Sequence, residues 1–319
     1  MKLKIALLDD YHSRAHQFAD WSSASFADFH FFSEHHPSDA QLIEDLQDFD
    51  AVGLMRERTP FPKSVIDQLP KLKLIVTSGK KNATIDVNAA AEKGITVCGT
   101  ESPGHATAEL AFLMLMAQSR QLLPLSNALQ QNNDWQPVMG RDMRGQTLGI
   151  IGLGRLGGQL AGFAHAMGMR VIAWSENLTQ ERCDELNVTK VSRDDLFENA
   201  DSVSIHLRHS PRTHSFITIE DLVRLGPNGY IVNTSRAEIF DLPALKNALD
   251  NNIIAGAATD VFDVEPADQS NWMVKHPRVL ATPHVGYCTD ETFHVFYSQM
   301  LEAFDAFFNA TPIRVIAPS

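Results

Sequence analysis

One segment near the middle of the chain constrains the fold more than any other. An apolar run from Thr147 to Ile151 leads directly into a glycine-rich turn, Gly152-Leu153-Gly154-Arg155-Leu156-Gly157. In a strand–turn–helix unit that binds a dinucleotide, the first glycine allows the tight turn, the second lets the backbone approach the pyrophosphate, and the third lets the helix pack closely on the strand. The phosphates lie at the helix N-terminus. The segment therefore predicts a dinucleotide-binding turn.

The residues that follow support this prediction, because a glycine pattern alone also occurs in many unrelated loops. Gly168 suits the end of a helix, and the run from Val171 to Trp174 is typical of a second buried strand. Between the turn and Gly168, apolar residues recur at helical spacing: Leu156, Leu160, Phe163, Ala164 and Met167. A complete βαβ unit is therefore expected here.

Length and charge narrow the class of protein. The chain has 319 residues, 44% of them hydrophobic, which is more than one hydrophobic core usually holds, so two domains are expected. The formal net charge of -12 argues against nucleic acid or an anionic membrane as a partner, because both favour a basic surface. Small molecules are the expected partners.

We expect no membrane span, no export signal and no metal site. The longest apolar run, Leu110 to Ala117, is far shorter than the ~20 residues that cross a bilayer. The apolar N-terminal segment reaches the acidic Asp9 before a secretory region develops. The three cysteines are far apart and lack metal-ligand spacing. A cytoplasmic protein without a bound metal follows from these features.

The order of strand-like and helical segments predicts the architecture. Alternation of the two favours an α/β fold, in which parallel sheets are covered by helices on both faces. The helical stretch from Ala106 to Gln121 is apolar nearly all round, which suits a crossing point between domains, and the polar segment from Gln130 to Asn133 suits a surface loop. Strand-like runs in the first part of the chain are Lys4 to Leu8, Ala51 to Met55, Leu72 to Thr77 and Ile95 to Cys98.

Because the dinucleotide turn begins only near residue 150, another α/β unit must precede it. The amphipathic stretch from Glu291 to Phe308 is expected to return to that first unit. We therefore predict a discontinuous substrate-binding, catalytic domain of residues 1–100 plus 288–319. Residues 101–287 are expected to form a Rossmann domain that binds NAD or NADP.

Three polar residues in this second domain follow strand-like runs. Arg236 comes after the run from Tyr230, Asp260 after the run from Ile253, and His284 after the run from Val279. Open α/β sheets bind ligands at the carboxyl ends of their strands. We expect these three side chains to converge beside a bound dinucleotide.

Four segments in this order resemble those of the D-2-hydroxyacid dehydrogenase family, and the resemblance covers nearly the whole chain. It implies two Rossmann-like or flavodoxin-like parallel-sheet domains with an active-site cleft between them. It also implies an oxidoreductase that interconverts a 2-oxo acid and a D-2-hydroxy acid with a nicotinamide cofactor. The segments are Gly149 to Gly157, Val232-Asn233-Thr234-Ser235-Arg236, Asp260-Val261-Phe262-Asp263-Val264-Glu265-Pro266 and Thr282-Pro283-His284-Val285-Gly286.

The chemistry requires these residue types together. His284 as imidazolium can donate a proton to the carbonyl oxygen, because its unperturbed pKa lies near neutrality. Glu265 can accept a hydrogen bond from the other ring nitrogen and so fix the tautomer and favour the charged ring. Arg236 offers a planar fork for the substrate carboxylate that lysine cannot reproduce.

The resemblance also implies a set of cofactor contacts. Ser175 stands where an acidic residue usually binds the adenosine ribose, and Glu176 follows it, so NAD is expected, with NADP as the alternative. Arg208 replaces the proline of the family's His-x-Pro segment, where it either reaches an adenosine phosphate or is solvated. The expected contacts are Gly152, Gly154, Arg155, Leu156, Gly157, Ser175, Glu176, His206, Thr234 and Asp260, the last of which resembles the family's nicotinamide-contacting aspartate.

In the first domain, the family's glycine-rich carboxylate loop corresponds to Ser78 to Asp86, with Lys81 in place of a glycine. The resemblance implies that backbone amides from Ser78 to Lys80 meet the substrate carboxylate. The nearby cationic residues suggest either a second anionic group on the substrate or a solvated charged rim. The expected substrate contacts are Arg56, Ser78, Gly79, Lys80 and Tyr287, and the further cations are Lys81 and Arg58.

Several alternatives stay open at the level of sequence. The resemblance implies a homodimer in which the cofactor domain is buried. It also covers a D-3-phosphoglycerate dehydrogenase without its regulatory domain, and an NAD(H)-sensing interaction module like the C-terminal-binding corepressors. The physiological substrate, the choice between NAD and NADP, and the reaction direction do not follow from these residues.

Overall fold

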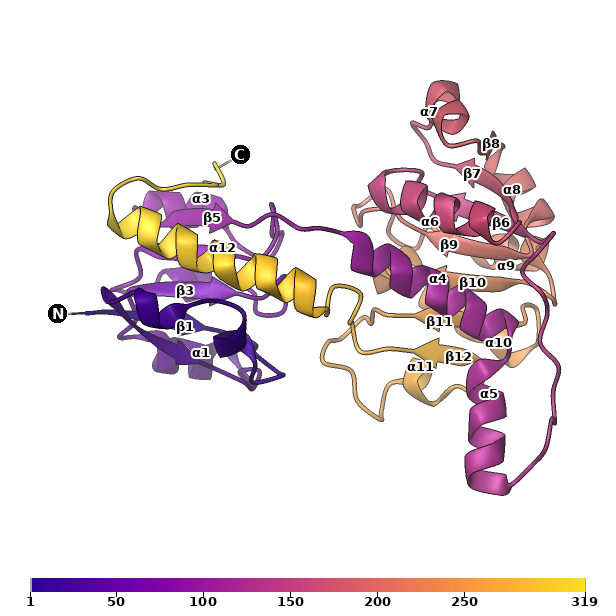
Figure 1. The fold of residues 1–319 in the computed structure, drawn as a ribbon, viewed down its shortest axis with the longest axis horizontal. Coiled ribbons are helices and arrows are strands. Elements are labelled where there is room, and N and C mark those ends of the chain that lie inside the picture. The colour runs from indigo at the N-terminus through magenta and orange to yellow at the C-terminus, as the bar shows by residue number, and fades with distance from the viewer. Residues whose placement is uncertain (1, 319) are drawn as a thin grey trace. The chain divides into compact units, whose positions relative to one another are not determined.

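The structure is a computed structural model that describes residues 2–318, and the chain divides into two compact units (Figure 1). The first unit contains the residues up to Pro103 together with those from Cys288 onward, and the second contains Gly104–Tyr287. The chain therefore passes from one unit to the other twice.

The first unit is a parallel sheet of five strands in the order β2-β1-β3-β4-β5. In this flavodoxin-like order the switch point lies between β1 and β3, and the loops that follow these two strands border it. The strands are β1 (Leu3–Leu7), β2 (Ala27–Phe31), β3 (Ala51–Leu54), β4 (Leu74–Thr77) and β5 (Thr96–Gly99), and the helices are α1 (Asp39–Leu46), α2 (Lys63–Ile66), α3 (Val87–Glu92) and α12 (Asp290–Phe308).

Successive residues of the buried strands face opposite layers, as strand geometry requires. Val52 and Leu54 pack into the core cluster that includes residues of α1, α2 and α3. Gly53 faces α12 so closely that a Cβ there would lie 3.4 Å from both Met300 and Phe304. The fully buried Phe296 and Phe304 anchor α12 on this face of the sheet.

The second unit is a parallel sheet of seven strands in the order β12-β11-β10-β9-β6-β7-β8. From β6 the chain builds outward in both directions, so the switch point lies between β6 and β9. The strands are β6 (Thr147–Ile151), β7 (Arg170–Trp174), β8 (Thr189–Lys190), β9 (Ser202–Ile205), β10 (Tyr230–Asn233), β11 (Gly256–Thr259) and β12 (Val279–Ala281).

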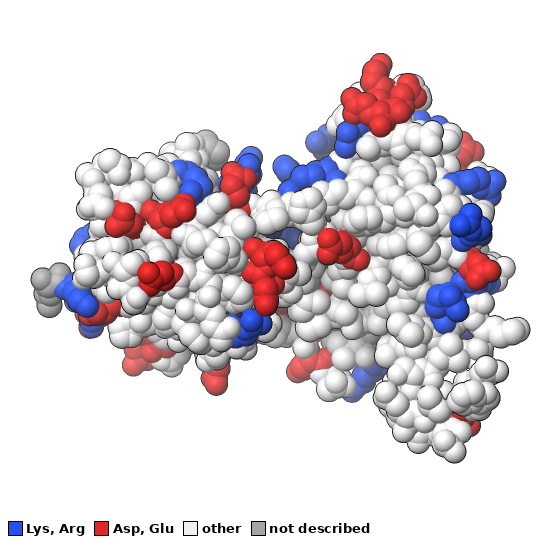
Figure 2. All heavy atoms as spheres, in the orientation of Figure 1, with Lys and Arg blue, Asp and Glu red and all other residues white. Residues whose placement is uncertain are grey.

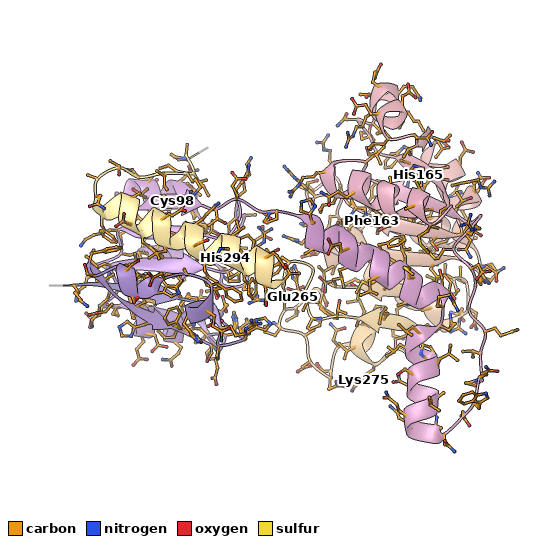
Figure 3. All side chains as sticks on the ribbon, viewed as in Figure 1. Cys98, Phe163, His165, Glu265, Lys275 and His294 are labelled. Carbon is orange, nitrogen blue, oxygen red and sulfur yellow. The ribbon has the colours of Figure 1, made fainter. Side chains whose placement is uncertain are left out.

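Helices cover both faces of this sheet (Figure 1). One layer contains α4 and α6. These two helices touch through Phe112 and Phe163, whose ring centroids are 5.7 Å apart. Phe163 is labelled on α6 in Figure 3. The other layer contains α8, α9 and α10. The helices of the unit are α4 (His105–Ser119), α5 (Leu122–Asn127), α6 (Arg155–Ala166), α7 (Gln180–Glu185), α8 (Arg193–Asn199), α9 (Ile219–Leu225), α10 (Leu242–Asp250) and α11 (Trp272–Lys275).

The predicted α/β architecture with parallel sheets is confirmed, and two local features differ from expectation. The segment from Gln130 to Asn133 was expected to be a loop, but most of it belongs to an exposed π-helical turn, Ala128–Asn132, that continues α5. The edge strand Ala27–Phe31 was not predicted. After Ala27 its residues alternate between polar and aromatic, and three of these four are exposed, so it lacks the apolar run that marks the central strands.

Charged residues of both signs are interspersed over the visible surface, and an acidic group covers α7 (Figure 2). Within residues 2–318, none of the helices combines the length and apolar character needed to cross a membrane.

Replacing Phe304 by alanine tests the role of α12 in the first unit. The side chain is fully buried, so the cavity left behind should lower the free energy of unfolding by about 3–5 kcal/mol. Denaturant unfolding measures this loss. Val315→Ala, at a residue that is 52% exposed, serves as the control and should change stability by less than about 0.5 kcal/mol. Equal stability of the two variants would contradict this packing.

Candidate active site

The glycine-rich turn has the geometry that a close backbone approach requires. Gly152 has φ +98°, and a Cβ there would lie 2.6 Å from the carbonyl oxygen of His206. A Cβ at Gly157 would lie 2.2 Å from the carbonyl oxygen of Gly152. At Gly154, by contrast, a Cβ would meet nothing within 4 Å. The turn is therefore tightly packed on the protein side and open at its middle glycine.

Two buried polar atoms beside this turn, His206 Nδ1 and Thr234 Oγ1, have no hydrogen-bond partner among residues 2–318. Asn233 pairs with Ile205 in the sheet, so Thr234 and His206 occupy the next position along each strand. Burial of the ring lowers the pKa of His206 to about 4, which keeps it neutral near pH 7. Since buried polar atoms are nearly always satisfied, these two atoms fit a site that a polar ligand completes.

Ser175 and Glu176 lie at the end of β7, next to the same turn. The backbone N–H of Gly152 donates to the carbonyl of Trp174, the residue before Ser175, at 3.0 Å. Ser175 is partly buried and Glu176 is exposed. Both residues that the sequence assigned to the ribose therefore follow the strand that borders the turn.

His284 and Glu265 form a hydrogen-bonded pair. The His284 Nδ1–H donates to Glu265 Oε2 at 2.6 Å, and the two side chains are 29% and 33% exposed. Glu265 lies on the loop between β11 and α11 (Figure 3), and its other oxygen accepts from the backbone N–H of Phe262 at 2.9 Å. Burial acts to raise the pKa of Glu265, but the hydrogen bond to His284 and the charge of that ring hold it below its usual value.

Arg236 belongs to the same group, because its positive charge also helps to lower the pKa of Glu265. Its Nη1 donates to the carbonyl of Ser235 at 2.7 Å, and its own carbonyl accepts from Asn233 Nδ2 at 2.8 Å. Asn233 Oδ1 in turn accepts from the N–H of Ser235 at 2.9 Å. Asn233, which the sequence did not single out, thus shapes the turn that carries Arg236.

Asp260 is only 1% exposed and lies beneath the loop that carries His284. Its carboxylate accepts hydrogen bonds from the Thr282 hydroxyl and from the backbone N–H groups of Val285 and Gly286, at 2.6, 2.8 and 2.7 Å. Burial raises the pKa of Asp260 despite these three donors. The sequence assigned Asp260 to the nicotinamide, whereas in the structure both of its oxygens hold this loop.

The ring of Tyr287 lies edge-on to that of His284, with centroids 5.8 Å apart, and the residue is 9% exposed. His284 itself has φ +52°, an uncommon value for a residue other than glycine. The second unit therefore brings together His284, Glu265, Arg236 and Tyr287 and holds the histidine in a specified backbone conformation.

In the first unit, the loop after β4 differs from expectation. The N–H of Ser78 donates to the carbonyl of Leu54, and the N–H of Gly79 donates to Thr100 Oγ1. Within residues 2–318, the N–H groups of Lys80 and Lys81 make no such bond. The amides of Ser78 and Gly79, expected to meet a carboxylate, are thus satisfied inside the unit, and the unbonded amides lie further along the loop.

Three of the four cationic side chains near this loop, those of Lys80, Arg56 and Arg58, are engaged within the first unit. Lys80 pairs with Glu101 at 2.7 Å. Arg56, at φ +56°, donates from Nη1 to the carbonyl of Ser78 at 3.3 Å. Arg58 Nη1 donates to the carbonyl of Asp9 at 2.9 Å.

Asn82 is a further residue that the sequence did not single out. Its Nδ2 donates to the carbonyl of Arg56 at 2.5 Å and to Thr77 Oγ1 at 3.0 Å. The side chain is 8% exposed. Asn82 therefore ties the loop after β4 to the loop after β3.

Across residues 2–318, the structure contains no cluster of three or more His, Cys, Asp or Glu residues that could hold a metal ion.

Glu265→Gln should reveal the contribution of this carboxylate to stability. Because the folded-state pKa of Glu265 is lowered, its contribution is present above its unfolded pKa, about 4.3, and is lost as pH falls through the folded value. Denaturant unfolding of the parent and the variant between pH 7 and pH 3.5 should show a stability difference that shrinks toward acid. A difference independent of pH would contradict the charged pair.

The chain is similar in sequence to several known proteins. Residues 112–286 match the family model described as the NAD binding domain of D-isomer specific 2-hydroxyacid dehydrogenase. The chain is 36% identical over 257 residues to D-3-phosphoglycerate dehydrogenase of Synechocystis sp., covering 80% of this chain and 46% of that protein. It is 34% identical over 265 residues to glyoxylate reductase of Korarchaeum cryptofilum, covering 80% and 79% of the two chains.

A solved structure, that of phosphoglycerate oxidoreductase from Vibrio cholerae, superposes with a TM-score of 0.91 at 33% identity and covers 97% of this chain and 99% of that one. The chain spans about half the length of the first curated relatives it matches, 46% and 52%. The family model includes the glycine-rich turn together with Arg236, Glu265 and His284, and the chain belongs to the D-isomer specific 2-hydroxyacid dehydrogenase family.

Proposed function

We propose that this protein interconverts a 2-oxo acid and a D-2-hydroxy acid with NAD as the cofactor. One observation carries the proposal: the His284–Glu265 pair, at 2.6 Å, lies at the carboxyl ends of the strands of the unit that also carries the dinucleotide turn. Open α/β sheets bind their ligands at this edge. An acid–base pair at the same sheet edge as a cofactor turn is the arrangement that hydride transfer to a carbonyl needs.

The nicotinamide, when bound, supplies or accepts the hydride. The glycine turn from Gly152 to Gly157 would hold the pyrophosphate, with Arg155 and Leu156 opening α6 beneath it. Ser175 and Glu176 would meet the adenosine ribose. The unpartnered atoms of His206 and Thr234 would be satisfied from the cofactor side. We keep Asp260 out of this set, because its oxygens already serve the His284 loop.

His284 serves as the acid–base group. Glu265 accepts from Nδ1, so the ring presents Nε2 to the substrate, where it donates a proton during reduction and accepts one during oxidation. Arg236 binds the substrate carboxylate and polarises the adjacent carbonyl through its planar fork. Tyr287, packed edge-on to His284, would line the substrate site.

For the first unit we propose an anion-binding role of its own. The unbonded amides of Lys80 and Lys81 are suited to a carboxylate, as exposed successive amides commonly are. A charged extension of the substrate would have to compete with Glu101 for Lys80. Arg56 stabilises this loop through its hydrogen bond to the carbonyl of Ser78.

The decisive experiment measures the decay of NADH absorbance with a panel of 2-oxo acids: glyoxylate, hydroxypyruvate, pyruvate, bulky branched 2-oxo acids and phosphohydroxypyruvate. Turnover of at least one to the D-hydroxy acid is the expected result. Preference for phosphohydroxypyruvate would identify a second anionic group on the substrate. Tight NADH binding without turnover of any member would overturn the enzymatic proposal and favour a cofactor-sensing role.

Substitutions separate the roles of the two catalytic groups. His284→Gln should lower kcat by about 10²–10⁴-fold, the usual contribution of general acid–base catalysis, with little change in NADH binding. Arg236→Lys should raise KM and also lower kcat, because a point charge cannot replace the bidentate fork. Steady-state kinetics of both variants provides the test. Unchanged kinetics of His284→Gln would exclude it as the acid.

We further propose that the protein is a cytoplasmic homodimer. Cys98, Cys183 and Cys288 are all free, as expected in a reducing compartment. Large exposed apolar side chains concentrate between residues 113 and 139, a pattern typical of a subunit interface. They are Leu113, Leu122, Leu123, Leu129, Trp135, Val138 and Met139.

Leu123→Asp should therefore shift the protein toward monomer, because it places a charge among these apolar residues. Light scattering coupled to size exclusion reports the change. Val223→Asp, at an exposed residue of α9, is the matched control and should leave the mass unchanged. A monomeric parent protein would end this proposal directly.

A further inference from the structure

The loop between β9 and α9 is anchored against the proposed cofactor site at both of its ends. At its start, the side chain of Leu207 lies 3.2 Å from the position that a Cβ on Gly152 would take. At its end, the ring of Phe216 stacks on Trp174, with centroids 5.5 Å apart and an interplanar angle of 15°. Trp174 directly precedes Ser175, so this loop borders the end of β7.

Hydrogen bonds within the loop give it a defined shape. Thr213 Oγ1 accepts from the N–H of Ser210 and donates to the carbonyl of Arg208, both at 2.8 Å. The N–H of His214 donates to the carbonyl of Ser210 at 3.0 Å. His209 Nε2 and His214 Nδ1 are 3.3 Å apart. The side chains of the loop are therefore displayed from a fixed backbone.

The loop is rich in basic residues although the chain carries a net charge of -12. Arg208, His209, Arg212 and His214 are all exposed. The guanidinium groups of Arg208 and Arg212 make no hydrogen bond or ion pair with any residue between 2 and 318. Most other arginines of this unit are engaged: Arg193, for example, binds Asp221 at 2.6 Å. The guanidinium groups of Arg208 and Arg212 are therefore available to bind an anion at this loop.

The end of β7 lacks the acidic residue that would oppose such an anion. That position, which takes the adenosine ribose in a dinucleotide site, is occupied by Ser175. Glu176, one residue further, is exposed and is the carboxylate nearest in sequence. The strands β7 and β9 flank β6 on its two sides. The loops after them therefore border the same glycine turn.

We propose that this loop recognises the 2′-phosphate of NADP(H), with Arg208 as the residue that determines cofactor choice, so that the protein binds NADPH as well as NADH. This inference rests on the proposed function, in which a nicotinamide dinucleotide occupies the turn. A phosphomonoester carries about -1.5 to -2 charges near pH 7. An arginine fork binds such a group through two parallel hydrogen bonds. NADH has a hydroxyl at the same place and gains little from the loop.

Binding of the two nucleotides to the full chain tests the proposal without requiring turnover. Energy transfer from tryptophan to the reduced nicotinamide provides the signal, since Trp174 adjoins the site. We expect the parent protein to bind NADPH at least as tightly as NADH in low salt. Arg208→Ala should weaken NADPH on the order of tenfold, the loss typical of a charged hydrogen-bonded contact, and leave NADH unchanged. Glu176→Gln should tighten NADPH.

Arg170→Ala is the matched control. Arg170 is an exposed arginine at the first position of β7, at the opposite end of the same strand, and its loss should alter neither affinity. Raising the ionic strength should weaken NADPH more than NADH. Tight NADH binding with no NADPH binding would overturn this inference and leave the proposed function standing. So would an Arg208→Ala variant that affects both nucleotides equally or neither. Failure to bind either nucleotide would overturn both.

Discussion

The position of His284 depends on the hydrogen bonds that the buried carboxylate of Asp260 accepts. Removing a carboxylate from water is costly unless hydrogen bonds replace its hydration. Here all the replacing donors come from residues 282, 285 and 286, which surround His284 on the chain. The hydrogen bonds that satisfy the buried carboxylate therefore also fix the conformation of the short loop that carries His284. The left-handed backbone conformation of His284 is thus held by Asp260 and its hydrogen-bond donors, which need take no part in the proton transfer.

The positions of the main site residues could be predicted from the sequence because parallel sheets follow a simple rule. Every strand presents its carboxyl end at the same edge, so residues directly after strand-like runs meet there. Arg236, Asp260 and His284 follow this rule, and Glu265 was assigned by family resemblance. The glycine turn was identifiable because its neighbours, an apolar strand and a helix of apolar periodicity, are local features.

Hydrogen-bond partners that are distant in the sequence could not be predicted in the same way. The N–H of Gly79 donates to the hydroxyl of Thr100, 21 residues away. The carboxylate of Asp260 accepts from the N–H of Gly286, 26 residues away. Which amides are satisfied and which remain unbonded depends on these tertiary neighbours. The same holds for the unpartnered atoms of His206 and Thr234, whose burial is set by the packing of adjacent strands. The residue types were enough to predict the chemistry of the site. Which hydrogen-bond donors are already satisfied, and which remain available to a ligand, could be seen only in the fold.

The return of α12 to the first unit has a consequence for how the chain is made. The second unit is continuous from Gly104 to Tyr287, so it can fold as soon as it has left the ribosome, as domains generally do during synthesis. The first unit must wait for Phe296, Met300 and Phe304, which cover one face of its sheet. Until then that face stays open to unwanted association. The residues before Gly104 are therefore translated ahead of the second unit but complete their fold after it.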